Sequence, residues 1–137
     1  MMKEKKTYQP ITSEDICQIY ESLQSKNLVS FPITADGEKK VEAIVANINN
    51  PHFGVEIYKT AQEKAVAYLY FLIKGHPFVD GNKRTACLVF LTLCALTDLY
   101  PNFKKFGLDQ MAVFIEQTKE EDHQKVIAEI TSLIFKK

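Results

Sequence analysis

One short stretch of the chain gathers side chains that could do chemistry. Positions 75–85 read Gly-His-Pro-Phe-Val-Asp-Gly-Asn-Lys-Arg-Thr. His76 is a candidate general base, because an imidazole titrates near neutral pH. Asp80 is a candidate Mg²⁺ ligand, because this ion prefers carboxylate and phosphate oxygens. Pro77 and Gly81 argue against a continuous helix through both residues, so we expect them to lie on a loop.

The end of this stretch has the features of an anion site. Gly81 and Asn82 directly precede an apolar helical segment, and the start of a helix has free N–H groups and a partial positive charge. A turn that contains glycine lets those N–H groups point at a phosphate. Lys83 and Arg84 add two positive charges. The stretch therefore predicts a phosphate site beside a base and a metal ligand, with Phe78 anchoring the loop in the core.

Other patterns that mark phosphate chemistry are absent from the sequence. A P-loop has a Gly-Lys pair, whereas here Asn82 stands between the second glycine and the lysine. The chain contains no His-Asp dipeptide, which excludes the metal-dependent phosphohydrolase pattern. His52 falls in a turn and His123 lies among acidic residues at a helix start, so neither is expected to take part in chemistry.

The elements that position the loop are predicted to be helices. Apolar residues recur at helical spacing, as at Ile16, Ile19, Tyr20 and Leu23 behind a capping sequence that begins at Thr12. Further helices are expected around 41–48 and over 57–74, 83–99, 108–118 and 121–135. The sequence thus predicts an all-α fold, a compact bundle of about six helices in a single domain that spans residues 1–137.

The segment 83–99 differs from the other helices because it is apolar nearly all round. A helix of that kind belongs at the centre of a bundle, so we expect it to be almost fully buried. Cys87 and Cys94 are expected to pack in the core with it. Its polar first turn, residues 83–85, must reach the surface or line a pocket.

One segment departs from the helical pattern. Apolar residues alternate over positions 29–33, and an Asp-Gly turn signal follows at 36–37. Pro32 removes a backbone donor, so the segment predicts an edge strand or a flap and not a strand inside a sheet. An ordinary loop between two helices is the alternative.

Composition and charge limit the function further. The 137 residues include 17 basic and 17 acidic side chains, and this zero balance argues against a non-specific nucleic-acid binder. The three cysteines form no Cys-x-x-Cys spacing and are too few for a disulfide framework. With no apolar run near the start and none long enough to span a bilayer, we expect a cytoplasmic protein without a membrane partner.

The loop resembles the signature of a known family. Residues 76–84 resemble the Fic/Doc loop, H-x-F-x-[D/E]-G-N-[G/K]-R, at seven constrained positions of nine. Adenylyl-transferring members have Gly where this chain has Lys83, and a second Arg at the position of Cys87. Both departures make the chain similar to the Doc, or death-on-curing, branch. Members of that branch are toxins of toxin–antitoxin pairs that phosphorylate elongation factor Tu and thereby stall translation.

The resemblance implies a role for each residue of the loop, with ATP and Mg²⁺ as cofactors. His76 would deprotonate the hydroxyl group of the target protein, and Asp80 would bind Mg²⁺ held by the ATP phosphates. Arg84 would neutralise the terminal phosphates. The remaining implied roles are an anion nest for Gly81, Asn82 and Lys83 and a structural role for Phe78.

The resemblance also bears on partners. The segment with Phe31, Ile33 and Thr34 resembles the flap on which family members dock their target. The family's inhibitory motif, [S/T]-x-x-x-E-[G/N], is absent, because no Glu in this chain is followed by Gly or Asn. This implies either that a separate antitoxin supplies an inhibitory helix in trans or that there is no inhibitor.

Two other functions stay open at this point. One is a Fic-type adenylyltransferase that tolerates Lys83 and attaches AMP to a protein hydroxyl. The other is a non-catalytic interaction module with a Fic fold. The presence of both His76 and Asp80 argues against the module, since a module that only binds has no chemical need for them.

Overall fold

The computed structural model describes residues 11–119 and 122–135, and these residues form six helices. The helices are α1 (Ser13–Ser25), α2 (Ala35–Asn49), α3 (Ala61–Gly75), α4 (Asn82–Leu96), α5 (Leu108–Gln117) and α6 (His123–Ile134). Within the described ranges the only β-type pairing is an isolated bridge between His52 and Val55. The predicted all-α fold of about six helices is therefore confirmed.

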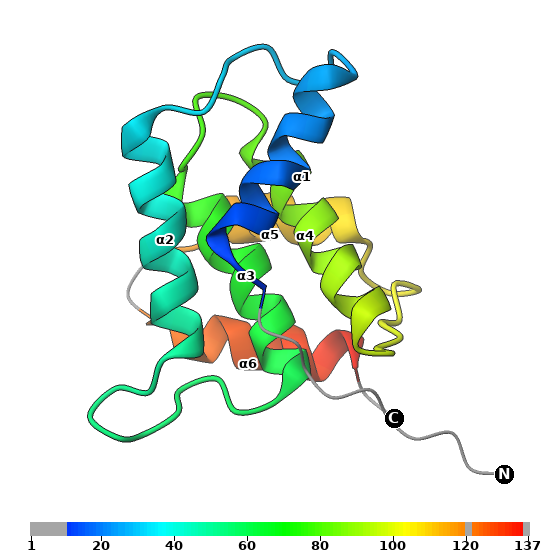
Figure 1. Ribbon diagram of the computed structural model, residues 1–137. Coiled ribbons are helices and arrows are strands. Elements are labelled where there is room, and N and C mark those ends of the chain that lie inside the picture. Colours follow the sequence, from blue (N-terminus) through cyan, green and yellow to red (C-terminus); the bar gives the residue numbers. More distant parts are fainter. Residues whose placement is uncertain (1–10, 120–121, 136–137) are drawn as a thin grey trace, which may run out of the picture.

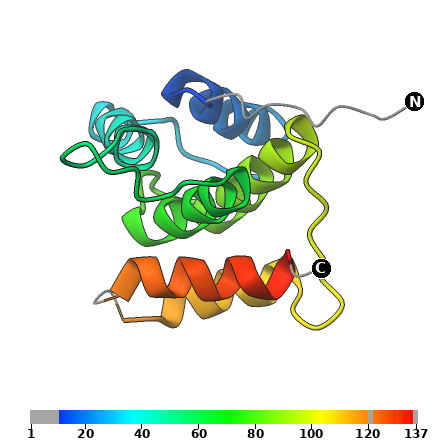
Figure 2. The same cartoon turned by 90° about the horizontal axis from the view of Figure 1, so that it is seen from below.

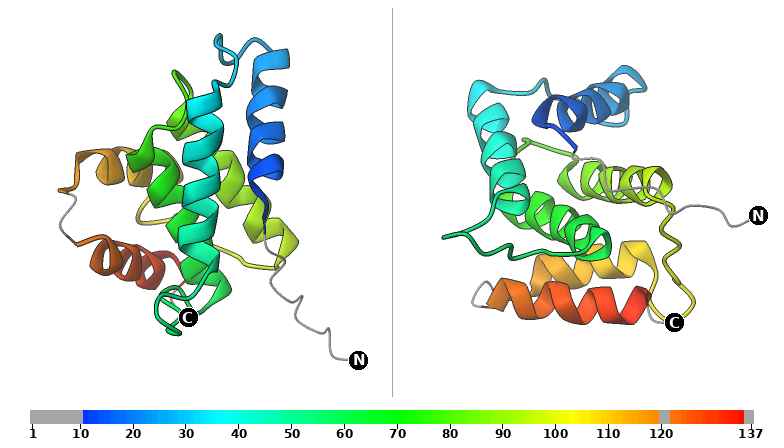
Figure 3. Two further views of the ribbon diagram at one scale, coloured as in Figure 1. Left: turned by 60° about the vertical axis from the view of Figure 1, so that its left-hand side comes forward. Right: turned by 60° about the horizontal axis from the view of Figure 1, so that its bottom comes forward.

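The helices form three layers of two, which the view from below shows most clearly (Figure 2). α1 and α2 make the first layer, α3 and α4 the second, and α5 and α6 the third. α3 packs against α2, α4, α5 and α6, so it is the central helix of the bundle (Figure 1). Its residues from Lys64 to Tyr70 are all buried. The loop between α3 and α4 lies at the same end of the bundle as the loop between α1 and α2 (Figures 1 and 3).

Three of the helices start at a threonine that caps the free N–H groups of the first turn. The hydroxyls of Thr12, Thr34 and Thr60 each accept a hydrogen bond from the backbone N–H three residues later. The cap at Thr34 corrects the predicted Asp-Gly turn at 36–37, because these two residues belong to the first turn of α2. Gly37 is needed there for packing, since a Cβ would lie 2.4 Å from the carbonyl oxygen of Pro77.

The prediction that the helix after the loop is almost fully buried is wrong. α4 ends at Leu96 rather than near residue 99, and only one side of it is in the core. Leu88, Leu91 and Leu96 expose 36%, 43% and 51% of their surface. The all-round apolarity of α4 predicted that it would lie at the centre of the bundle, but α3 lies there instead. The apolar side of α4 that faces away from α3 is left for other contacts.

Residues 26–34 join α1 to α2 without regular structure, so the predicted edge strand is not formed and the alternative, a loop, is confirmed. The described residues offer no second strand with which this segment could pair. The hydroxyl of Tyr20 donates a 2.5 Å hydrogen bond to the carbonyl of Phe31 and so ties the loop to α1. In the part of the chain that is described, no helix has the length and apolarity needed to span a membrane.

Candidate active site

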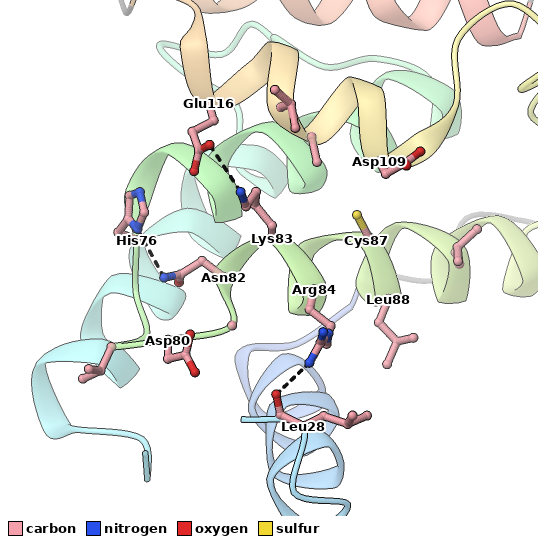
Figure 4. A pocket seen from close by; sticks show the side chains of 15 residues that line it. Leu28, His76, Asp80, Asn82, Lys83, Arg84, Cys87, Leu88, Asp109 and Glu116 are labelled. Carbon is pink, nitrogen blue, oxygen red and sulfur yellow. Dashed lines mark hydrogen bonds and ion pairs between the residues drawn. The ribbon is translucent and has the colours of Figure 1, made fainter. Parts of the chain in front are cut away.

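A pocket of about 760 Å³ opens where the loop after α3 meets α4 and α5 (Figure 4). This volume lies within the range of small-molecule sites, about 300–1,000 Å³. The sequence-predicted residues in its wall are His76, Asp80, Gly81, Asn82, Lys83 and Arg84. The structure therefore brings these six residues together around one cavity.

His76 is set by the end of α3. It is the C-terminal cap of that helix, with a left-handed backbone (φ 45°, ψ 56°), so the chain turns sharply and leaves the imidazole exposed. Nδ1 of the ring lies 3.2 Å from the amide nitrogen of Asn82 (Figure 4). This contact fixes the orientation of the ring at the pocket edge.

Asn82 holds the loop closed from inside. Its side-chain oxygen accepts a 2.9 Å hydrogen bond from the N–H of Phe78, and its amide nitrogen donates to the carbonyl of Phe78 at 2.8 Å. Because the Phe78 N–H must donate to an oxygen, the amide nitrogen is the atom that faces His76. The sequence interpretation placed Asn82 in an anion nest and did not foresee that its side chain braces the loop.

Phe78 anchors the loop as predicted. Its ring is buried and stacks on Tyr20 of α1, with the ring centroids 4.2 Å apart. Tyr20 also holds the carbonyl of Phe31, so one side chain of α1 joins the loop after α3 to the loop before α2. Burial raises the pKa of Tyr20, and the negative charge of Asp80 raises it further, so this hydroxyl stays protonated and remains a donor.

Gly81 opens the N-terminus of α4 toward the pocket. It is the N-terminal cap, with φ 77°, and no side chain among the described residues caps the helix there. The first N–H groups of α4 and the partial positive charge of its dipole are therefore available to an anion. The glycine is required for space as well, because a Cβ would lie 2.2 Å from Cγ1 of Val29.

The two cations of the first turn of α4 point to different partners. The ammonium of Lys83 lies 3.3 Å from a carboxylate oxygen of Glu116 on α5, across the pocket. The guanidinium of Arg84 donates a 2.7 Å hydrogen bond to the carbonyl of Leu28 (Figure 4). Arg84 therefore holds the loop before α2 against the pocket. This hydrogen bond does not occupy the other N–H groups of the guanidinium.

Cys87 is partly buried: it packs against the core, as predicted, and it also lines the pocket. Burial raises the pKa of its thiol to about 11, and the nearby Asp109 raises it while Lys83 lowers it. The thiol is therefore neutral at physiological pH and adds no charge to this wall. Cys94, on the side of α4 that faces the core, is buried as predicted.

None of the residues predicted for the target flap lines the pocket. Phe31, Ile33 and Thr34 lie outside its wall, whereas Leu28, which precedes them in the chain, belongs to it. Phe31 is half exposed, Ile33 packs partly on the core, and Thr34 caps α2. The loop between α1 and α2 thus borders the site without reaching over it.

Several residues of the site were missed by sequence reasoning. The wall opposite the loop is formed by α5, through Asp109, Ala112, Val113 and Glu116, and the exposed side of α4 contributes Leu88 and Leu91. No local signal marks these α5 residues, because their helix is separate from the loop in sequence and only the packing of the third layer brings them near. His123 lies outside the pocket wall: it is half-buried, and its Nδ1 lies 2.7 Å from the hydroxyl of Tyr70.

Part of this chain is similar in sequence to known proteins. The sequence model of the Fic/DOC family matches residues 10–94, which include α1 to α3, the loop and most of α4. A protein named Toxin Doc from Mycolicibacterium smegmatis is 40% identical over 65 residues, which cover 43% of this chain and 50% of that protein. The chain thus matches about half the length of this curated relative. No solved structure matches it.

Proposed function

Since this chain belongs to the Fic/DOC family, we propose that it is a Doc-like toxin that transfers the terminal phosphate of ATP to a hydroxyl group of a protein. The observation that carries the proposal is the pocket itself. It combines an exposed histidine, a carboxylate and the open N-terminus of a 15-residue helix within one cavity. A base, a metal ligand and an anion site are the parts that phosphoryl transfer to a hydroxyl requires.

The cofactors fit the residues that are present. Bound ATP would supply the phosphoryl group, and Mg²⁺ would neutralise the charge that develops on its phosphates. Asp80 would hold the metal, and the N–H groups after Gly81 would hold phosphate oxygens. The described residues contain no cluster of three or more protein ligands, which suits Mg²⁺, an ion that commonly binds one or two carboxylates together with phosphates and water.

His76 is the residue we assign to proton removal from the attacking hydroxyl. With its Nδ1 accepting from the amide of Asn82, a neutral ring carries its proton on Nε2. Proton removal by Nε2 needs the other tautomer, in which the contact with Asn82 is lost. The contact with Asn82 would thus orient the ring before the target hydroxyl binds, and it would be released when Nε2 takes the proton.

The walls of the pocket favour phosphoryl over adenylyl transfer. Lys83 puts a side chain where adenylyl-transferring relatives have glycine, and the neutral Cys87 stands where they have a second arginine. The wall that α5 forms opposite the loop carries the carboxylate of Asp109. Because negative charges repel phosphates, a nucleotide would keep its phosphates on the loop side, with the terminal phosphate beside His76.

The partners follow from the same proposal. As a Doc-like toxin the chain would act on a translation factor, with elongation factor Tu as the first candidate, in the cytoplasm. An antitoxin would neutralise it by supplying a helix in trans, because the chain's own sequence lacks the inhibitory motif. An amphipathic helix seated in an apolar groove is a common form of such recognition.

Expression in a bacterial host tests this proposal. We expect induction of the unmodified chain to arrest growth, because phosphorylation of a translation factor stops protein synthesis. Growth is followed by optical density, and translation by incorporation of a labelled amino acid. The His76→Ala variant, expressed to the same level, is the matched control and should leave growth intact. Normal growth with abundant, folded, unmodified protein would rule out the toxin function.

A further inference from the structure

The ion pair between Lys83 and Glu116 joins two walls of the pocket. Nζ of Lys83 and Oε1 of Glu116 are 3.3 Å apart, and the side chains expose 48% and 40% of their surface. Lys83 comes from the first turn of α4, at the anion site, and Glu116 comes from the last turn of α5 (Figure 4). The pair is thus a direct polar link between the side chains of the loop side of the pocket and those of α5.

Neither residue is placed where its own helix favours it. Lys83 is a cation at the positive end of the α4 dipole, and Glu116 is an anion at the negative end of the α5 dipole. Each position therefore costs its helix some stability. Helix stability does not explain why Lys83 and Glu116 stand at these positions, whereas their mutual attraction across the pocket does.

The main chain under Glu116 is held firmly. The ammonium of Lys74, from the last turn of α3, donates hydrogen bonds to the carbonyls of Glu116, at 3.5 Å, and Thr118. Ile115, the preceding residue, is fully buried. The backbone that carries the Glu116 carboxylate is therefore held in place, and this allows the carboxylate to hold the ammonium of Lys83.

Lys83 needs such a contact to stay at the pocket. Its side chain has four rotatable bonds, and the positive end of α4 and the neighbouring Arg84 repel its ammonium toward solvent. An ammonium has three donors, so Lys83 can keep its contact with Glu116 and still donate to a phosphate. A cation that is already in place loses less conformational freedom when the ligand binds.

We propose that Glu116 is a positioning residue, which holds the ammonium of Lys83 at the rim of the anion site so that it receives the phosphates of the nucleotide. Glu116 acts through Lys83 and does not itself contact the ligand. This inference rests on the proposed function, because it takes a triphosphate as the ligand of the site.

The test measures phosphate binding separately from transfer. Inorganic tripolyphosphate, with and without Mg²⁺, is titrated into the full chain and its variants by calorimetry, and the KM for ATP and kcat are measured in parallel. The variants are Glu116→Gln, Glu116→Asp, Lys83→Met and the double variant Lys83→Met/Glu116→Gln. Glu129→Gln is the matched control, because it removes the same charge from the exposed surface of α6.

We expect Glu116→Gln to weaken tripolyphosphate binding and to raise the KM for ATP by about threefold to fivefold, with kcat little changed, since exposed ion pairs contribute modestly. Glu116→Asp should restore part of the loss. In the Lys83→Met background, Glu116→Gln should have no further unfavourable effect, which a purely structural role of Glu116 would not produce.

Two results would overturn the inference. Tighter binding in Glu116→Gln would mean that the carboxylate competes with phosphate for Lys83, and an effect no larger than that of Glu129→Gln would mean that it plays no part. Failure of the proposed function has a different signature: if the chain binds tripolyphosphate through Lys83, with the predicted dependence on Glu116, but transfers nothing from ATP, this inference stands and the transferase function does not.

Discussion

Replacement of His76 by alanine should lower the rate of phosphoryl transfer by about 10²- to 10⁴-fold, the contribution typical of general acid–base catalysis. The reason is that His76 is the one histidine in the pocket wall, and its ring is held there by the contact with Asn82. The measurement is transfer of label from [γ-³²P]ATP to the target protein under single-turnover conditions. ATP binding should be nearly unchanged, because the imidazole is assigned to the hydroxyl and not to the phosphates.

The control for this variant is His52→Ala. His52 is an exposed histidine in the loop between α2 and α3, whereas the pocket lies beside the loop that follows α3. Its replacement should leave the transfer rate within about twofold of the unmodified chain, as is usual for surface changes away from a site. Both variants should unfold cooperatively at temperatures close to that of the unmodified chain. Wild-type turnover by His76→Ala would remove the base from the mechanism.

Replacement of Gly81 by alanine should destabilise the fold by about 2–5 kcal/mol. The left-handed backbone at φ 77° costs an alanine about 1–2 kcal/mol, and the new Cβ would lie 2.2 Å from Cγ1 of Val29, an overlap that adds about 1–3 kcal/mol. Relief of the overlap would push the loop before α2 away from the site, so transfer should fall as well. The free energy of unfolding is measured by urea denaturation.

Gly54→Ala separates the two contributions. Gly54 has nearly the same backbone conformation, with φ 79°, and no described atom lies within 4 Å of the Cβ that it would gain. Its replacement should cost only the backbone strain. Val29→Ala, combined with Gly81→Ala, should recover part of the extra stability that Gly81→Ala loses relative to Gly54→Ala. The reason is that Val29→Ala removes the Cγ1 methyl group with which the new Cβ overlaps. An equal cost for Gly54→Ala and Gly81→Ala would contradict the close packing of the loop on Val29.

The helix–loop–helix arrangement of the site could be predicted from the sequence, because it depends on residues that are neighbours in the chain. A proline and two glycines break the helix between positions 75 and 81, Phe78 supplies the only large apolar anchor of the loop, and an apolar run restarts the helix at Asn82. These features are read directly from residue types. The same reasoning gave the helical class, since apolar residues repeat at helical spacing in almost every segment.

The opposite wall could not be predicted, because it depends on packing between layers. Asp109 and Glu116 belong to an amphipathic helix like many others, and nothing in their spacing relates them to the loop. The burial of α4 was overestimated for a related reason. All-round apolarity shows that a helix avoids water, but it does not distinguish a central helix from one whose outer side lines a pocket.

The threonine cap at position 34 shows how two local signals can compete. The Asp-Gly pair at 36–37 has the composition of a hairpin turn, and the alternation before it resembles a strand. Thr34 instead caps a helix, the acidic residues at 36 and 38 favour its first turn, and Gly37 permits close approach to Pro77. Contacts with the loop after α3, which lies far along the chain, decide between the two.

The mass that the target gains tests the central claim most directly. The purified chain is incubated with ATP, Mg²⁺ and elongation factor Tu, or with a bacterial lysate, and modified proteins are analysed by intact-mass and peptide mass spectrometry. Transfer of a phosphoryl group adds about 80 Da to a hydroxyl-bearing residue, and this is the result we predict. An addition of about 329 Da, the mass of an AMP group, would contradict the account and make the chain an adenylyltransferase.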